Sequence, residues 1–230
     1  MSCTFEISPS RQIPRRLLKK DRAAFRALQS QTLPAAARLT EAELSDAMAL
    51  GELWGIFLGD RMTAALALLP MDAPCRPCLA PAKLAEEKLC GLDGPAQTAL
   101  LWAPAVDPSL CSLDAANTLR ILLESAIRRA EILGFDNGIS AAVPVRGALL
   151  SGLFQCGLRL TGLRPLLRLC ACYLFTLAPA DNILYNKEHL LRISPSDTKL
   201  LGRRLEEGWF AVGYAEGELL LARPSQEDTR

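Results

Sequence analysis

A 21-residue amphipathic segment in the middle of the chain most constrains its fold. Within residues 113–133 the apolar side chains step by three and by one, so a helix would place them on one buried face. Gly134 follows the last apolar residue, as expected where a helix ends, and Ser112 or Asp114 can cap the start. The predicted inner face consists of Leu119, Leu122, Leu123, Ala126, Ile127, Ala130 and Leu133.

Strands and shorter helices are predicted on both sides of this segment. Asp21 is placed to cap a helix that runs to about Gln31, and Thr40 with Glu43 forms a capping box for a second helix. Two apolar runs around Gly59 favour a β-hairpin, because Gly and Asp fit a tight turn. The other predictions are a short helix over 83–89, a buried strand over 98–106, a strand over 139–143, a helix over 146–156, and strands near 158–162 and 166–177.

The composition indicates a globular chain and excludes several classes of protein. The 230 residues amount to about one and a half domains of roughly 150 residues each. Half of them are hydrophobic, which argues against disorder, and the net charge of +1 argues against a strongly basic nucleic-acid binder. The longest charge-free apolar run, 169–180, is shorter than the roughly 18 residues of a membrane span. Since residues 1–16 contain no apolar leader, we expect a cytoplasmic protein with reduced thiols and no membrane partner.

The sequence divides at about residue 178. Residues 1–178 hold the elements above, and residues 179–230 are predicted to form a strand, a helix and a second hairpin. This order is the same as at the beginning of the chain, which suggests a degenerate half-repeat. The alternative is an unrelated extension that covers an edge of the sheet, because an open edge invites aggregation.

Two clusters of chemically active residues have simple interpretations. Cys75 and Cys78 have metal or redox spacing, but a closed zinc site needs four ligands. Cys90 and His189 are the remaining candidates, so we predict free loop thiols and no metal site. The basic run over 11–26 is interpreted as a solvated helix start, with an anion-binding patch as the alternative.

The order of elements resembles that of the GNAT acetyltransferase superfamily. Val106-Asp-Pro108 is similar to the end of its fourth strand, the 122–134 pattern to its third helix, and residues 151–158 to its last helical motif. The resemblance covers roughly Pro14 to Leu177. It implies an α+β fold, with a mixed, mostly antiparallel central sheet flanked by helices and a small C-terminal α/β extension.

The resemblance also implies an activity and a set of site residues. An enzyme of this kind transfers an acetyl or other acyl group from a coenzyme A thioester, such as acetyl-CoA, to an amine by direct attack. The acceptor would be a small molecule or a peptide. The resemblance is also compatible with a homodimer of the chain. The backbones of Ala105 and Val106 would bind pantetheine, and Asn117, Thr118, Leu119 and Arg120 would face the pyrophosphate at a helix N-terminus.

The sequence departs from the family pattern at two positions that carry chemistry. Asp114 and its neighbours replace the glycines of the phosphate loop, and Phe154 replaces the usual tyrosine, so it cannot donate a proton. Glu52, Asp107 and Tyr173 are the candidates for proton transfer, although Glu52 and Asp107 can equally be polar ends of strands. A catalytically inactive GNAT-fold module for binding or regulation is therefore the rival function, and an unrelated α+β domain is the rival fold.

Overall fold

The computed structural model describes residues 12–70, 97–135, 138–144, 149–167, 170–177, 185 and 189–224. The short helix predicted over 83–89 and the pair Cys75 and Cys78 lie outside these ranges. The beginning of the helix predicted over 146–156 also lies outside them.

One sheet runs through the described part of the chain. Its ten strands follow the order β1-β2-β3-β4-β5-β7-β6-β9-β10-β8, and each neighbouring pair is antiparallel except β4 with β5. The predicted mixed, mostly antiparallel sheet is therefore confirmed. The strands are β1 (Arg15–Arg16), β2 (Glu52–Leu58), β3 (Arg61–Pro70), β4 (Thr98–Val106), β5 (Gly138–Pro144), β6 (Arg159–Leu167), β7 (Cys170–Leu177), β8 (Leu191–Ile193), β9 (Phe210–Ala215) and β10 (Glu218–Ala222).

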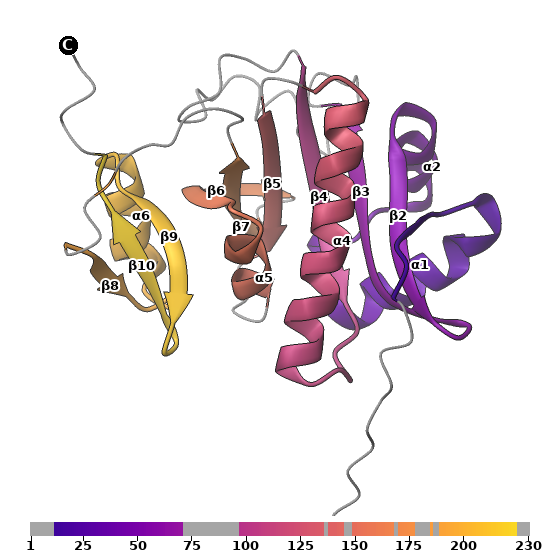
Figure 1. Ribbon diagram of the computed structural model, residues 1–230, viewed down its shortest axis with the longest axis horizontal. Coiled ribbons are helices and arrows are strands. Elements are labelled where there is room, and N and C mark those ends of the chain that lie inside the picture. Colours follow the sequence, from indigo (N-terminus) through magenta and orange to yellow (C-terminus); the bar gives the residue numbers. More distant parts are fainter. Residues whose placement is uncertain are drawn as a thin grey trace, which may run out of the picture.

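Helices cover both faces of this sheet, as Figure 1 shows. Alternate residues of β3 point to opposite faces, so Leu66 and Leu68 join one core cluster while Ala65 and Leu69 join the other. The first cluster includes the inner faces of α4 (Ser112–Ile132), α5 (Leu150–Gln155) and α6 (Thr198–Glu206). The second includes those of α1 (Arg22–Thr32) and α2 (Glu41–Leu50), and two short 3-10 turns, η1 (Lys19–Asp21) and η2 (Ala35–Ala37), connect the N-terminal elements.

The helix ends confirm some predicted caps and correct others. The capping box of Thr40 and Glu43 is present, and Gly134 ends α4 with a φ of +82°. The cap predicted for α4 is wrong, because it is the thiol of Cys111 that accepts the hydrogen bond from the Asp114 N–H, at 3.4 Å. Asp21 does precede α1, but its carboxylate caps the preceding 3-10 turn and not the helix.

Arginines of the basic run near the N-terminus form ion pairs with acids. Asp21 accepts two hydrogen bonds from Arg15 at 2.8 and 2.9 Å, and one from the backbone N–H of Leu18. The Arg15 hydrogen bonds outweigh the effect of burial and lower the pKa of Asp21 to about 2. Arg22 and Arg26 both pair with Glu41. This arrangement favours the interpretation of a solvated, ion-paired helix start over an anion-binding patch.

The C-terminal elements continue the sheet beyond β6. Leu160 of β6 pairs with Ala211 of β9, and the hydroxyl of Tyr173 on β7 donates to the carbonyl of Pro195. β8 pairs with the second strand of its hairpin, β10, whereas β1 at the other edge pairs with the first strand of its hairpin, β2. The C-terminal elements therefore extend the sheet past β6, and the division of the chain at residue 178 stays a prediction.

A buried ion pair fastens α4 to the N-terminal hairpin. Glu52, at the beginning of β2, accepts hydrogen bonds from Arg129 Nε at 3.0 Å and Nη2 at 2.8 Å, and from Trp54 Nε1 at 3.0 Å. Its side chain is only 8% exposed. The Arg129 hydrogen bonds outweigh burial, so the pKa of Glu52 lies below its ordinary value.

We expect Glu52→Gln to destabilise the protein by roughly 1.5–3 kcal/mol at pH 7, because hydrogen bonds to a charged group are lost. The lowered pKa means that Glu52 contributes stability above its unfolded pKa, and this contribution disappears as the pH falls through the folded value. The difference between the variant and the wild type should therefore shrink at acid pH. Urea unfolding at pH 7 and pH 3 measures it.

The matched control is Glu41→Gln, since Glu41 pairs with arginines while 55% exposed. Exposed pairs contribute about 0–1 kcal/mol. An equal loss in the free energy of unfolding for the two variants would contradict a special role of the Glu52 ion pair.

Candidate functional site

An extra residue interrupts β4 near its end. Ala105 pairs with Ala65 of β3, but Trp102 pairs with Ala67, so three steps along β4 match two along β3. Ala103 accommodates the difference with a φ of +47°, in the left-handed region that residues other than glycine seldom adopt. This is a β-bulge, and it bends the strand away from regular pairing.

Beyond the bulge, β4 and β5 separate. Their pairing runs from Thr98 with Gly138 to Trp102 with Ala142, and Pro104 has no N–H to continue it. The N–H of Asp107 donates to the Thr63 carbonyl of β3 at 2.8 Å. Because backbone groups alternate along a strand, the N–H and carbonyl of Val106 point the other way, toward the opening beside β5.

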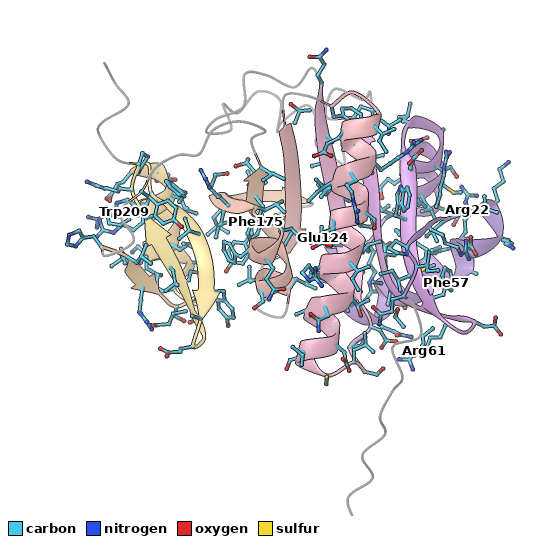
Figure 2. All side chains as sticks on the ribbon, in the orientation of Figure 1. Arg22, Phe57, Arg61, Glu124, Phe175 and Trp209 are labelled. Atoms are coloured by element: carbon cyan, nitrogen blue, oxygen red, sulfur yellow. The ribbon has the colours of Figure 1, made fainter. Side chains whose placement is uncertain are left out.

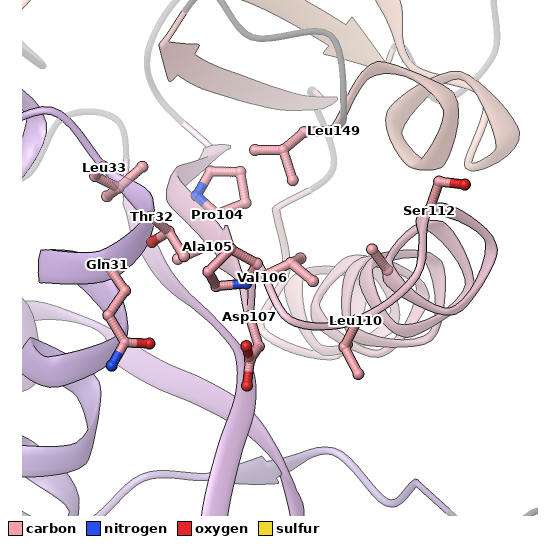
Figure 3. A pocket seen from close by; sticks show the side chains of 12 residues that line it. Gln31, Thr32, Leu33, Pro104, Ala105, Val106, Asp107, Leu110, Ser112 and Leu149 are labelled. Atoms are coloured by element: carbon pink, nitrogen blue, oxygen red, sulfur yellow. The ribbon is translucent and has the colours of Figure 1, made fainter. Parts of the chain in front are cut away.

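A cavity of about 330 Å³ lies at this opening. Figure 3 shows its walls: the end of β4, the start of α4, the end of α1 and the residue before α5. Ser112 marks the α4 side, and Gln31 and Thr32 mark the α1 side. Most of the remaining lining is aliphatic, from Leu33, Pro104, Val106, Leu110, Ala115 and Leu149. Such a concave, largely apolar pocket with a few polar groups is typical of a small-molecule site.

Asp107 is the ionisable side chain among the described residues that line the cavity. It is 2% exposed, forms an ion pair with Arg61 and accepts a hydrogen bond from the Ser109 N–H at 2.9 Å. Burial would raise the pKa of Asp107, but the Ser109 N–H and the Arg61 guanidinium together hold it below its ordinary value. Figure 2 shows Arg61 at the end of the β2–β3 hairpin, on the side of the sheet where α4 begins. Asp107 is therefore an ionised group that fixes the turn from β4 to α4.

The start of α4 combines features that attract and repel an anion. The first-turn amides and the helix dipole favour negative charge, and Ser112 carries one of these amides to the cavity. Asp114 lies in the same turn, with its carboxylate 3.1 Å from the Cys111 thiol. An anion at this helix start would therefore meet donors and one carboxylate.

No family model matches the sequence, and no curated protein does. Two solved structures match with TM-scores of 0.50. One is yncA from Salmonella typhimurium, a candidate acetyltransferase solved with its cofactor acetyl-CoA, at 16% identity over 75% of this chain and 96% of that one. The other is a candidate acetyltransferase from Staphylococcus epidermidis, at 10% identity over 74% and 99%.

The chain has the GNAT fold. The ribosomal-protein-S18-alanine N-acetyltransferase from Escherichia coli also matches, at 16% identity, with a TM-score of 0.48 over 76% of this chain and 99% of that one. In the structure, β4 and β5 splay apart where the cavity opens.

The GNAT fold brings some of the predicted site residues together and separates others. Ala105, Val106 and Asp107 line the cavity. Asn117, Thr118, Leu119 and Arg120 lie beyond the first turn of α4, because the helix already begins at Ser112. Thr118 and Leu119 are fully buried, Thr118 donates to Gln12 Oε1 at 3.1 Å, Arg120 pairs with Glu124 at 2.6 Å, and Asn117 is exposed.

Glu52 and Tyr173 do not line the cavity. Arg129, the partner of Glu52, is 17 residues along α4 from Ser112, which corresponds to about 25 Å of helix. Tyr173 is fully buried, and burial, with a smaller effect of Tyr214, raises the pKa of its hydroxyl to about 12. The ring of Phe154 packs edge-on against Phe175, with ring centroids 5.3 Å apart.

Sequence reasoning missed the walls that α1 and α5 contribute. Leu33 ends α1 and Leu149 precedes α5, and both line the cavity. Neither belongs to a motif, so the sequence carries no signal for them beyond their being apolar.

The observed groups fit the pantetheine arm of a coenzyme A thioester. Pantetheine carries amides, and Val106 offers an N–H and a carbonyl toward the cavity. The phosphates of coenzyme A would meet the start of α4, where the glycines usual for the fold are replaced.

No group of three metal-binding side chains occurs in the described ranges. No helix within those ranges is long and apolar enough to cross a membrane.

The bulge predicts an unusual response to glycine. Ala99→Gly, in the regular part of β4, should destabilise the protein by about 1–2 kcal/mol, since a buried methyl group and backbone rigidity are lost. Ala103→Gly loses the same groups but removes the strain of a left-handed alanine, which costs roughly 1–2 kcal/mol. Its net effect on the free energy of unfolding should therefore be near zero. Chemical denaturation of both variants measures the difference, and equal losses would contradict the bulge.

Proposed function

We propose that this protein binds a coenzyme A thioester in the cavity at the end of β4 and transfers the acyl group to an amine by direct attack. The observation that carries this proposal is the backbone of Val106, which faces the cavity where β4 leaves β5. Acetyl-CoA is the reference donor, and the acetyl-CoA named with the yncA structure supports this choice. The acceptor is a small-molecule or peptide amine.

Different residues of the cavity would bind different parts of the donor. The Val106 N–H donates to a pantetheine carbonyl, and the Val106 carbonyl accepts from a pantetheine N–H. The first-turn amides of α4, from Ser112 onward, face the pyrophosphate. Asp107 holds the connection between these two groups, since its carboxylate binds the Ser109 N–H and Arg61.

Asp107 is a poor general base in this arrangement. Its lowered pKa leaves it ionised near neutral pH, and a carboxylate of low basicity accepts a proton weakly. We therefore propose that Asp107 acts as a positioning residue. A cytoplasmic location is part of the same proposal, since the described Cys111 and Cys156 are thiols outside any disulfide.

A second candidate function is binding without catalysis. Phe154 packs in the core and has no proton to donate, and Asp114 sits where an anion would approach α4. These two observations favour a GNAT-fold module that keeps its shape and a binding cavity but has lost turnover. Release of free coenzyme A in the presence of an amine panel distinguishes the two functions.

The deciding experiment uses Val106→Pro. Proline removes the N–H that points into the cavity while keeping the carbonyl, and the N–H is outside the β3 ladder, so the fold should persist. We expect acetyl-CoA affinity to fall about tenfold, the effect of one hydrogen bond of about 1.4 kcal/mol. Calorimetric titration measures it.

The matched control is Val106→Ala, which trims the side chain and keeps the N–H. Equal affinities for the Pro and Ala variants would contradict the placement of pantetheine on Val106. Absence of binding to the wild-type chain, in both calorimetry and thermal unfolding, would contradict the proposed function itself. Bound ligand at about 100 times its Kd should stabilise the fold by roughly 2.7 kcal/mol.

A further inference from the structure

We infer that the site prefers an aliphatic acyl group of several carbons over acetyl. This inference rests on the proposed function, because it assumes that the cavity holds the thioester end of the donor. It concerns a different property, the chemical class of the acyl chain. The observations that carry it are the direction in which the donor would lie and the aliphatic nature of the wall that the acyl group would meet.

The fold sets the direction in which the donor would lie. Its phosphates belong at the start of α4, beside Ser112, and its arm passes Val106. The arm then continues along β4 toward the bulge at Ala103. The thioester and its acyl group are therefore directed past Pro104, toward the end of the cavity that Leu33 and Leu149 line.

Aliphatic side chains form that end of the cavity. Figure 3 shows Pro104 between Leu33, from the end of α1, and Leu149, from before α5. Leu33 is 3% exposed and belongs to the core cluster beneath α1, while Leu149 packs against the cluster on the other face. The two core clusters thus supply one side chain each to the wall that the acyl group would meet.

The polar side chains near this wall either have partners within the protein or are exposed to solvent. The Thr32 hydroxyl donates to the Leu28 carbonyl at 2.8 Å, and the Asp107 carboxylate binds Arg61 and the Ser109 N–H. Gln31 is exposed to solvent. A wall of this kind offers few hydrogen-bond partners to a polar acyl group, whereas the burial of each methylene group strengthens binding, because its transfer out of water is favourable.

The position of the wall supports a chain longer than two carbons. The cavity of about 330 Å³ would hold the end of the pantetheine arm as well as the acyl group. An acetyl group ends one carbon beyond the thioester carbonyl, whereas a butyryl to octanoyl chain would extend along the wall formed by Leu33 and Leu149.

The test is a calorimetric titration of the full chain with coenzyme A and with acetyl-, butyryl-, hexanoyl- and octanoyl-CoA. We expect the Kd to fall about three- to fourfold for each added methylene until the cavity is full. A Kd that is the same for acetyl-CoA and the longer donors, or that rises with chain length, would overturn the inference while leaving the proposed function intact. If neither coenzyme A nor any of these donors binds, the proposed function fails, and this inference fails with it.

Two variants separate a chain-binding wall from general hydrophobic attraction. Leu149→Phe fills part of the space at this wall, so it should reduce the gain in affinity from acetyl- to hexanoyl-CoA at least tenfold. Ile132→Phe adds the same ring size at a site that is 74% exposed, at the far end of α4, and should keep the full gain. A chain-length effect that survives Leu149→Phe would refute the wall. Should Leu149→Phe fail to fold, the wild-type series still decides the preference.

Discussion

The structure depends on the burial of β4 on both of its faces. Each of its nine residues is buried, with α1 packed on one face and α4 on the other. A strand covered in this way must satisfy its backbone groups through neighbouring strands. At Trp102 the pairing with β5 ends, and the bulge at Ala103 turns the last residues toward a cavity. Unpaired backbone beside an apolar wall is a place where a ligand can complete the missing hydrogen bonds.

Two ion pairs hold the elements around this strand. Glu52 and Arg129 join the hairpin to the C-terminal half of α4, and Asp107 and Arg61 join the same hairpin to the turn before α4. The pKa of Glu52 is held low mainly by Arg129, and that of Asp107 by the Ser109 N–H together with Arg61. Both carboxylates were candidates for catalysis by their sequence positions, and their partners favour structural roles. The proposed chemistry therefore depends on the backbone of Val106 and the start of α4.

Much of the fold could be predicted, because periodicity and turn residues act locally. The β2–β3 hairpin, the capping box of Thr40 and Glu43, and the end of α4 at Gly134 all follow from short sequence patterns. The cap of α4 could not be predicted, since a Cys111 thiol competes poorly with Ser or Asp as a cap by propensity alone. At the site, Ala105 and Val106 were predicted to face the donor and do line the cavity, whereas Leu33 and Leu149 carry no sequence signal.

The sequence by itself determined the alternation of apolar and polar residues, and with it the elements and their order. The mixed sheet was what the family resemblance implied. Tertiary structure alone decided which polar groups became neighbours, because Arg129 and Glu52 are 77 positions apart and Arg61 and Ser109 are 48 apart. It also decided where the cavity lies, since the walls come from α1, β4, α4 and the residue before α5. Local patterns fix local backbone geometry, but a site made from distant segments exists only once the core has brought them together.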